Sequence, residues 1–165
     1  MERPGVRLVT LTGPGGVGKT RLAAAVGERL SDRFDAGTVF VPLAAVTEPG
    51  LVLDGIGRAV GADLASTGSP LQALAETFGD GAWLLILDNL EQVIGAAPDL
   101  GELLASCPRL AILATSRTVQ GAARRTGIPG AAAAAASRSR RSAAGRTRVL
   151  AGGGAVRGPG PRGAA

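Results

Sequence analysis

Histidine and tyrosine are absent from the 165-residue sequence, which also has a single cysteine and only 2% aromatic residues. Without histidine the chain lacks the commonest catalytic base and metal ligand, so Ser-His-Asp hydrolases and zinc sites are excluded. One cysteine excludes an internal disulfide. Cys107 follows Leu100, Leu103 and Leu104 at helical spacing, which predicts a buried packing thiol and not a nucleophile.

Long hydrophobic runs are also lacking. The first residues, MERPGVRLVTLTGPGG, contain no apolar stretch long enough for a signal sequence. No run elsewhere approaches the roughly 20 apolar residues that a membrane span requires. We therefore expect a soluble, cytoplasmic protein that has no membrane partner.

Acidic residues are missing from the C-terminal part of the chain. All 13 carboxylates precede Gly121, and Ala, Gly, Arg and Pro fill 36 of the 45 positions in residues 121–165, so the net charge of +5 arises in this segment. A sequence pI near 11.1 would suggest a nucleic-acid partner. However, the segment has no aromatic residue to stack on bases, and basic low-complexity runs are usually solvated. We predict a low-complexity, disordered tail over 121–165 without direct nucleic-acid binding.

The first 120 residues alternate between strand-like and helix-like patterns. Leu22, Val26, Leu30 and Phe34 recur every fourth position and predict one apolar helical stripe. The segment SPLQALAETF, from Ser69, has the residue types of a capped helix start. This alternation predicts an α/β three-layer sandwich with a mainly parallel sheet in one domain, residues 1–120. The expected strands cover residues 6–12, 38–43, 83–87 and 110–115.

The segment GPGGVGKT matches the phosphate-loop pattern G-x-x-x-x-G-K-[ST] and contains the only lysine of the chain, Lys19. It follows a predicted strand and opens a predicted helix, as the pattern requires. The glycines let backbone N–H groups approach an anion, and the helix N-terminus adds partial positive charge. We predict that Lys19 reaches the β and γ phosphates and that Thr20 ligates Mg²⁺. The predicted nucleotide-binding residues are Gly13, Pro14, Gly15, Gly16, Val17, Gly18, Lys19 and Thr20.

Two further residues follow predicted strands. Asp88, at the end of WLLILD, is either the Walker B carboxylate that holds Mg²⁺ or a cap of the next helix, paired with Glu91. Arg117 is either a γ-phosphate sensor or a solvated arginine at a strand end. The position after Asp88, where many ATPases place a glutamate, is Asn89, which cannot accept a proton from water. We expect hydrolysis to be slow or absent, with Glu91 as a possible substitute base.

The segments LVTLTGPGGVGKTRLA, LLILDNLEQV, LLASCPRL and LATSR resemble the STAND class of P-loop NTPases. Within that class they are similar to the NB-ARC-like ATPase module of bacterial LuxR- and AfsR-type transcriptional regulators. The resemblance implies a sheet order of 5-1-4-3-2 and a switch between ATP-bound and ADP-bound states with Mg²⁺. It also implies that Asp88 and Arg117 take part in catalysis as Walker B and sensor residues. In full-length relatives, DNA and other regulator domains are the expected partners.

The resemblance ends near Arg117. We expect that the fifth strand is missing, that the first strand is left as an unpaired edge, and that the chain is a fragment with a truncated or frame-shifted tail. The leading interpretation is an Mg-ATP-binding switch module with little or no turnover. A small P-loop ATPase or kinase with genuine turnover remains an alternative, as does a nucleotide-binding core with a nucleic-acid-binding tail.

Overall fold

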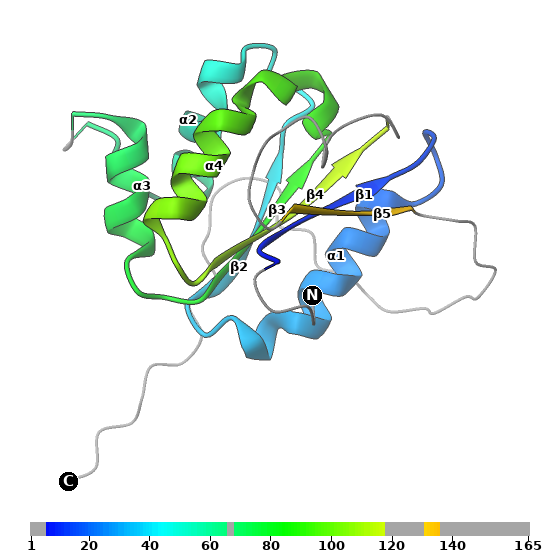
Figure 1. Ribbon diagram of the computed structural model, residues 1–165, viewed down its shortest axis with the longest axis horizontal. Coiled ribbons are helices and arrows are strands. Elements are labelled where there is room, and N and C mark those ends of the chain that lie inside the picture. Colours follow the sequence, from blue (N-terminus) through cyan, green and yellow to red (C-terminus); the bar gives the residue numbers. More distant parts are fainter. Residues whose placement is uncertain (1–5, 66–67, 118–130, 136–165) are drawn as a thin grey trace, which may run out of the picture.

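The computed structural model describes residues 6–65, 68–117 and 131–135, the last of these as backbone only, and shows an α/β fold. Its core is a parallel five-stranded sheet with helices on both faces (Figure 1). The sheet order is β2-β3-β4-β1-β5, which is the predicted order 5-1-4-3-2 read from the opposite edge. The strands are β1 (Leu8–Thr12), β2 (Gly37–Pro42), β3 (Trp83–Asp88), β4 (Leu110–Ser116) and β5 (Ala131–Ala135).

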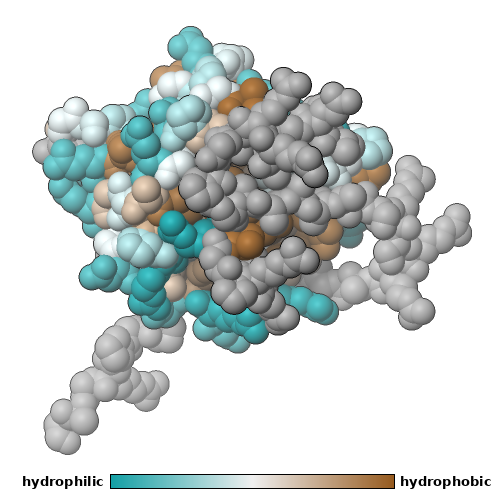
Figure 2. Space-filling model, viewed as in Figure 1, coloured by the Kyte–Doolittle hydropathy of each residue, from teal (hydrophilic) through white to brown (hydrophobic). Residues whose placement is uncertain are grey.

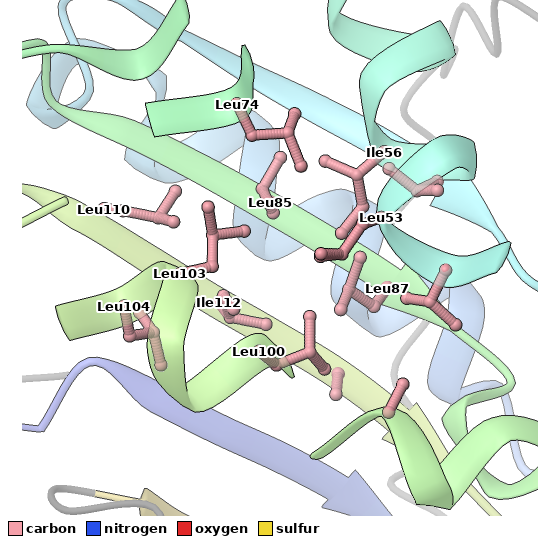
Figure 3. Packing of buried hydrophobic residues seen from close by; sticks show 14 of the residues in the cluster. Leu53, Ile56, Leu74, Leu85, Leu87, Leu100, Leu103, Leu104, Leu110 and Ile112 are labelled. Atoms are coloured by element: carbon pink, nitrogen blue, oxygen red, sulfur yellow. The ribbon is translucent and has the colours of Figure 1, made fainter. Parts of the chain in front are cut away.

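Continuously apolar strands explain the layered arrangement, because neighbouring residues of a strand point to opposite faces. In β3, Leu85 and Leu87 pack in the larger hydrophobic cluster, whereas Leu84 and Ile86 pack in the smaller one. Figure 3 shows leucines of the helices pointing toward strand leucines in the larger cluster. That face carries α2 (Val52–Val60), α3 (Pro70–Phe78) and α4 (Ala97–Ser106), and the other carries α1 (Lys19–Leu30). Short 3-10 helices cover Ser31–Arg33, Pro49–Leu51 and Leu90–Ala96.

Helix α3 begins where the sequence predicts. The Ser69 hydroxyl accepts a hydrogen bond from the Gln72 backbone N–H at 3.2 Å, and Pro70 occupies the first helical position. The Gln72 side chain also donates to Glu76 Oε1 at 3.2 Å, one helical turn further along α3. The predicted start of this helix is therefore confirmed.

The expectation that the fifth strand is missing is wrong. Residues Ala131–Ala135 form β5, which pairs in parallel with β1 from Leu8↔Ala131 to Thr12↔Ala135. Strand β1 thus lies between β4 and β5 and is not an unpaired edge. An alanine run has low strand propensity and little apolar surface, but sheet pairing uses backbone groups that every residue except proline carries. The other residues of the predicted tail, 121–130 and 136–165, lie outside the described residues.

The predicted apolar stripe of α1 is only partly correct. Val26, Leu30 and Phe34 are partly buried and pack against the smaller cluster, as predicted, whereas Leu22 is 44% exposed. The apolar and small residues that α1 buries fully are Ala23 and Gly27. Helix α1 also ends at Leu30, so Phe34 lies beyond it. A Cβ atom at Gly27 would lie 2.5 Å from Ile86 Cδ1. The helix therefore approaches β3 through its smallest residues, closer than a leucine stripe would permit.

Cys107 is buried in the larger cluster, with 1% of its surface exposed, as predicted for a packing thiol. Burial raises the pKa of this thiol, partly opposed by the positive charge of Arg7. A thiol that resists deprotonation is a poor nucleophile. Cys107 therefore contributes to packing.

The described surface exposes few large hydrophobic side chains: Leu22, Leu51 and Ile94. On the face in Figure 2, hydrophobic residues form small groups between hydrophilic ones. Among the described residues, no helix has the length and apolar character needed to cross a membrane.

Candidate functional site

The loop after β1 lies at the carboxyl edge of the sheet, where parallel α/β folds bind ligands. Its start is tied to β4 by a hydrogen bond from the Gly13 N–H to the Ser116 carbonyl at 3.3 Å. Gly16 (φ 75°) and Gly18 (φ 89°) have left-handed backbone conformations, which explains glycine at both positions. A Cβ atom at Gly15, Gly16 or Gly18 would meet nothing within 4 Å, so the space above the loop is open.

This open space is a cavity of about 230 Å³. Five of the predicted phosphate-loop residues line it, together with Arg117, which directly follows β4 and is distant from them in the sequence. Three of its lining side chains carry positive charge, which suits an anionic ligand. The cavity is lined by Gly15, Gly16, Gly18, Lys19, Thr20, Arg21, Asn89 and Arg117.

Lys19 begins α1 and is 92% buried, since only 8% of its surface is exposed. Its Nζ donates to the Gly13 carbonyl at 2.8 Å and to the Pro14 carbonyl at 2.9 Å. Neither partner carries a charge, and within the described residues no carboxylate pairs with Lys19. A buried ammonium without a counter-ion is costly, so this position favours an anion in the adjoining cavity.

Thr20 and Asp88 lie together, although they are far apart in the sequence. The Thr20 hydroxyl donates to Asp88 Oδ1 at 2.8 Å, joining the start of α1 to the end of β3. Asp88 does not cap the following 3-10 helix, whose N-cap residue is Asn89 and has no side-chain cap bond. The geometry thus favours the Walker B interpretation of Asp88 over the capping interpretation.

The oxygen donors at this point fit a small hard cation. The Thr20 hydrogen bond uses the proton of its hydroxyl and leaves lone pairs free to ligate Mg²⁺. No group of three or more His, Cys, Asp or Glu side chains in the described ranges could hold a metal on its own. Any Mg²⁺ here would therefore depend on Thr20, water held by Asp88, and phosphate oxygens.

Thr115 belongs to the same cluster and was not predicted from the sequence. Its hydroxyl donates to Asp88 Oδ1 at 2.6 Å and accepts the Asn89 N–H at 3.1 Å. In the sequence it belongs to the segment LATSR, in which only Arg117 was given a predicted role. Only the pairing of β3 with β4 brings it to Asp88.

Arg117 lies at the cavity but is engaged by Glu91. The Arg117 Nε atom is 3.3 Å from Glu91 Oε1, and the Arg117 N–H donates to Glu91 Oε2 at 3.2 Å. The Arg117 side chain is 65% exposed, whereas that of Glu91 is 16% exposed. Glu91 therefore contacts the backbone N–H and the Nε atom of Arg117, while the rest of the Arg117 side chain is largely exposed beside the cavity.

Asn89, directly after Asp88, has an unusual backbone conformation. Among the described residues it is the single non-glycine residue with positive φ, at 66°. This conformation is rare for non-glycine residues but tolerated by asparagine. It turns the chain directly after Asp88 and places Asn89 against the cavity.

A parallel sheet whose first strand leads through a glycine loop into a helix, with the lysine and threonine placed as above, defines a P-loop NTPase fold. The family model for the AAA domain matches residues 4–121. The chain belongs to this family.

Relatives with known sequences include large proteins. The Mycobacterium tuberculosis protein named "Putative HTH-type transcriptional regulator Rv0890c" is 44% identical over 118 residues, covering 71% of this chain and 13% of that protein. The M. tuberculosis "Uncharacterized protein Rv0894" is 40% identical over 118 residues, which are 30% of its length. The chain therefore spans less than a third of the curated relatives it matches.

Solved structures share the fold. The Aeropyrum pernix ORC1 protein in complex with DNA has a TM-score of 0.64 and 16% identity over 82% of this chain and 40% of that one. The A. pernix ORC2 protein, in ADPNP and ADP complexes, has a TM-score of 0.61 and 20% identity over 79% and 42%. At these identities the likeness establishes the P-loop NTPase architecture alone.

Proposed function

We propose that this domain is an Mg-ATP-binding nucleotide switch of a STAND-type transcriptional regulator, with slow or no hydrolysis. The observation that carries the proposal is the buried Lys19 ammonium, which has two carbonyl partners and faces a cavity at the start of α1. Nucleotide phosphates would supply the negative charge that the surrounding residues do not.

Relatives support the regulatory part of the proposal. A protein 44% identical over the matched region carries the name of an HTH-type transcriptional regulator, and this region is 13% of its length. The nucleotide domain is thus a small portion of that relative. In a longer protein of this kind, we propose that DNA contacts and signal recognition belong to other segments in the cytoplasm.

Slow turnover is proposed from the groups near the expected γ-phosphate. The Asn89 side chain is an amide and cannot serve as a general base. Glu91 Oε1 lies 3.3 Å from Arg117 Nε and Glu91 Oε2 accepts the Arg117 backbone N–H, so both carboxylate oxygens are directed at Arg117. A P-loop ATPase with genuine turnover would require Glu91 to leave this contact.

ATP titration of the purified protein in the presence of Mg²⁺ tests the proposal. Lys19→Ala should weaken binding about 10- to 100-fold, the value of a charge-assisted hydrogen bond. Arg29→Ala is the matched control, because it removes the same charge from the exposed last turn of α1. Equal ATP affinity in wild type and Lys19→Ala would refute nucleotide binding by the loop.

Turnover is measured separately by phosphate release. We expect no release above the rate of the Lys19→Ala protein during a single-turnover experiment of minutes. Rapid release by the wild type that Glu91→Gln abolishes would replace the switch proposal with the ATPase alternative.

A further inference from the structure

The Thr115 hydroxyl is a buried polar group at the carboxyl edge of the sheet, with 1% of the residue exposed. It comes from β4, whereas the predicted magnesium residues come from α1 and β3. Nothing in the phosphate-loop or Walker B patterns requires a threonine here. Its position beside Asp88 therefore calls for a separate explanation.

The hydrogen bonds of Thr115 leave its hydroxyl no freedom to rotate. The proton is donated to Asp88 Oδ1 at 2.6 Å, a short distance typical of a hydroxyl bound to a carboxylate. A lone pair accepts the Asn89 N–H at 3.1 Å. One hydroxyl thus connects the side chain of Asp88 to the backbone that follows it.

Both hydroxyl donors of the cluster meet at the same carboxylate atom. Thr20, which precedes Asp88 in the sequence, and Thr115, which follows it, each donate to Oδ1 of Asp88. The other oxygen, Oδ2, has no hydrogen-bond partner among the residues whose positions are described. The carboxylate is consequently held by one oxygen, and the second is available to a water ligand of a cation.

We propose that Thr115 is a positioning residue for the magnesium site: its hydroxyl orients Asp88 so that Oδ2 serves the cation. This inference rests on the proposed binding of Mg-ATP. Oriented groups that contact metal ligands or their waters typically change metal affinity or activity 10- to 100-fold when removed. The expected signature is therefore a loss of the magnesium contribution to ATP binding.

A purely structural role makes a different prediction. If Thr115 only satisfies the Asn89 N–H, its removal lowers stability but changes ATP affinity equally with and without Mg²⁺. The decisive quantity is the magnesium factor, defined as the ATP affinity with Mg²⁺ divided by the affinity in EDTA.

Three variants isolate the hydroxyl. Thr115→Val removes it at nearly constant shape, and Thr115→Ser keeps it while removing the methyl group. Thr38→Val on β2 is the matched control, because the Thr38 hydroxyl is buried and has no hydrogen-bond partner within the described part of the chain. Thermal unfolding without nucleotide reports the stability of each variant.

Fluorescent ATP is titrated against each full-length protein in Mg²⁺ and in EDTA. We expect Thr115→Val to reduce the magnesium factor at least about tenfold, and Thr115→Ser and Thr38→Val to retain it. A wild-type factor in folded Thr115→Val, or an equal loss in Thr38→Val, would overturn the inference. If Thr115→Val does not fold, Thr115→Ser decides: retention of the factor supports the hydroxyl role, and its loss contradicts it.

The outcomes separate this inference from the proposed function. If wild type binds ATP through Lys19 but has equal affinity with Mg²⁺ and in EDTA, the positioning role fails and nucleotide binding stands. If Lys19→Ala does not weaken binding, both fail.

Discussion

The glycines of the phosphate loop differ in backbone conformation. Gly18 has φ 89° and Gly16 φ 75°, whereas Gly15 is not in the left-handed region, although all three have open space where a Cβ would lie. The loop pattern treats these glycines alike, but their conformations separate them. The difference can be measured by alanine substitution.

Gly18→Ala should lower the free energy of unfolding by about 1 kcal/mol, because an L-residue in the left-handed region is strained. Gly15→Ala is the matched control and should leave stability unchanged, since it has neither strain nor a close neighbour. Urea denaturation of the nucleotide-free proteins measures both. Equal losses in the two variants would show that conformational strain does not explain Gly18.

Arg117 allows a test of phosphate sensing. We expect Arg117→Ala to weaken ATP binding about tenfold and ADP binding little, because a sensor contacts the γ-phosphate alone. Arg109→Ala is the control: this exposed arginine precedes β4 and pairs with Asp35 at 3.7 Å. Parallel ATP and ADP titrations decide, and an equal loss for both nucleotides would identify Arg117 as a solvated arginine that only pairs with Glu91.

At the scale of elements, the strands and the start of α3 followed from local patterns. Continuous apolar runs predicted β1 to β4 within about two residues, and Ser69 with Pro70 predicted the start of α3. These features depend on side-chain polarity and on local hydrogen bonds, which a sequence displays directly.

The elements that were misjudged depend on small residues. In α1, Ala23 and Gly27 are more deeply buried than Val26 and Leu30 of the predicted stripe, and alanines alone form β5. Small side chains permit a helix to approach a sheet closely, and backbone pairing does not need a large side chain. A search for large apolar residues therefore does not detect these elements. Thr115 was missed for a related reason, because its partner lies on a neighbouring strand and not nearby in the sequence.

The capped start of α3 makes a prediction of its own. Ser69→Ala should cost about 1 kcal/mol in the free energy of unfolding, because the Gln72 N–H loses its acceptor. Ser106→Ala is the comparison, since the Ser106 hydroxyl bonds the Glu102 carbonyl within α4 and caps no helix start. Chemical denaturation that shows the same stability for wild type and Ser69→Ala would mean that the cap contributes nothing.

At the scale of the whole molecule, β5 joins the C-terminal part of the chain to the sheet that carries the site. Its pairing covers the edge of β1 that would otherwise present unpaired backbone groups. The low-complexity composition of that segment gave no indication of this contact. The pairing can be tested by shortening the chain.

A chain ending at Gln120 should have a melting temperature lower by roughly 4 °C or more than a chain ending at Ala136, which retains β5. It should also aggregate at lower concentration, because the edge of β1 is exposed. Thermal unfolding and light scattering at several concentrations measure the two effects. Identical behaviour of the two shortened chains would mean that β5 does not stabilise the sheet.

The close approach at Gly27 has a mechanical consequence. Helix α1 carries Thr20 at its start, and β3 carries Asp88 at its end. A Cβ atom at Gly27 would require the end of the Ile86 side chain to shift, so the two elements pack closely there. We therefore expect α1 and β3 to move together when a phosphate is gained or lost. We expect Arg117 to move first when the bound nucleotide changes. Its side chain lines the cavity and pairs with one carboxylate, that of Glu91, so it can change partner while α1 and β3 stay in place.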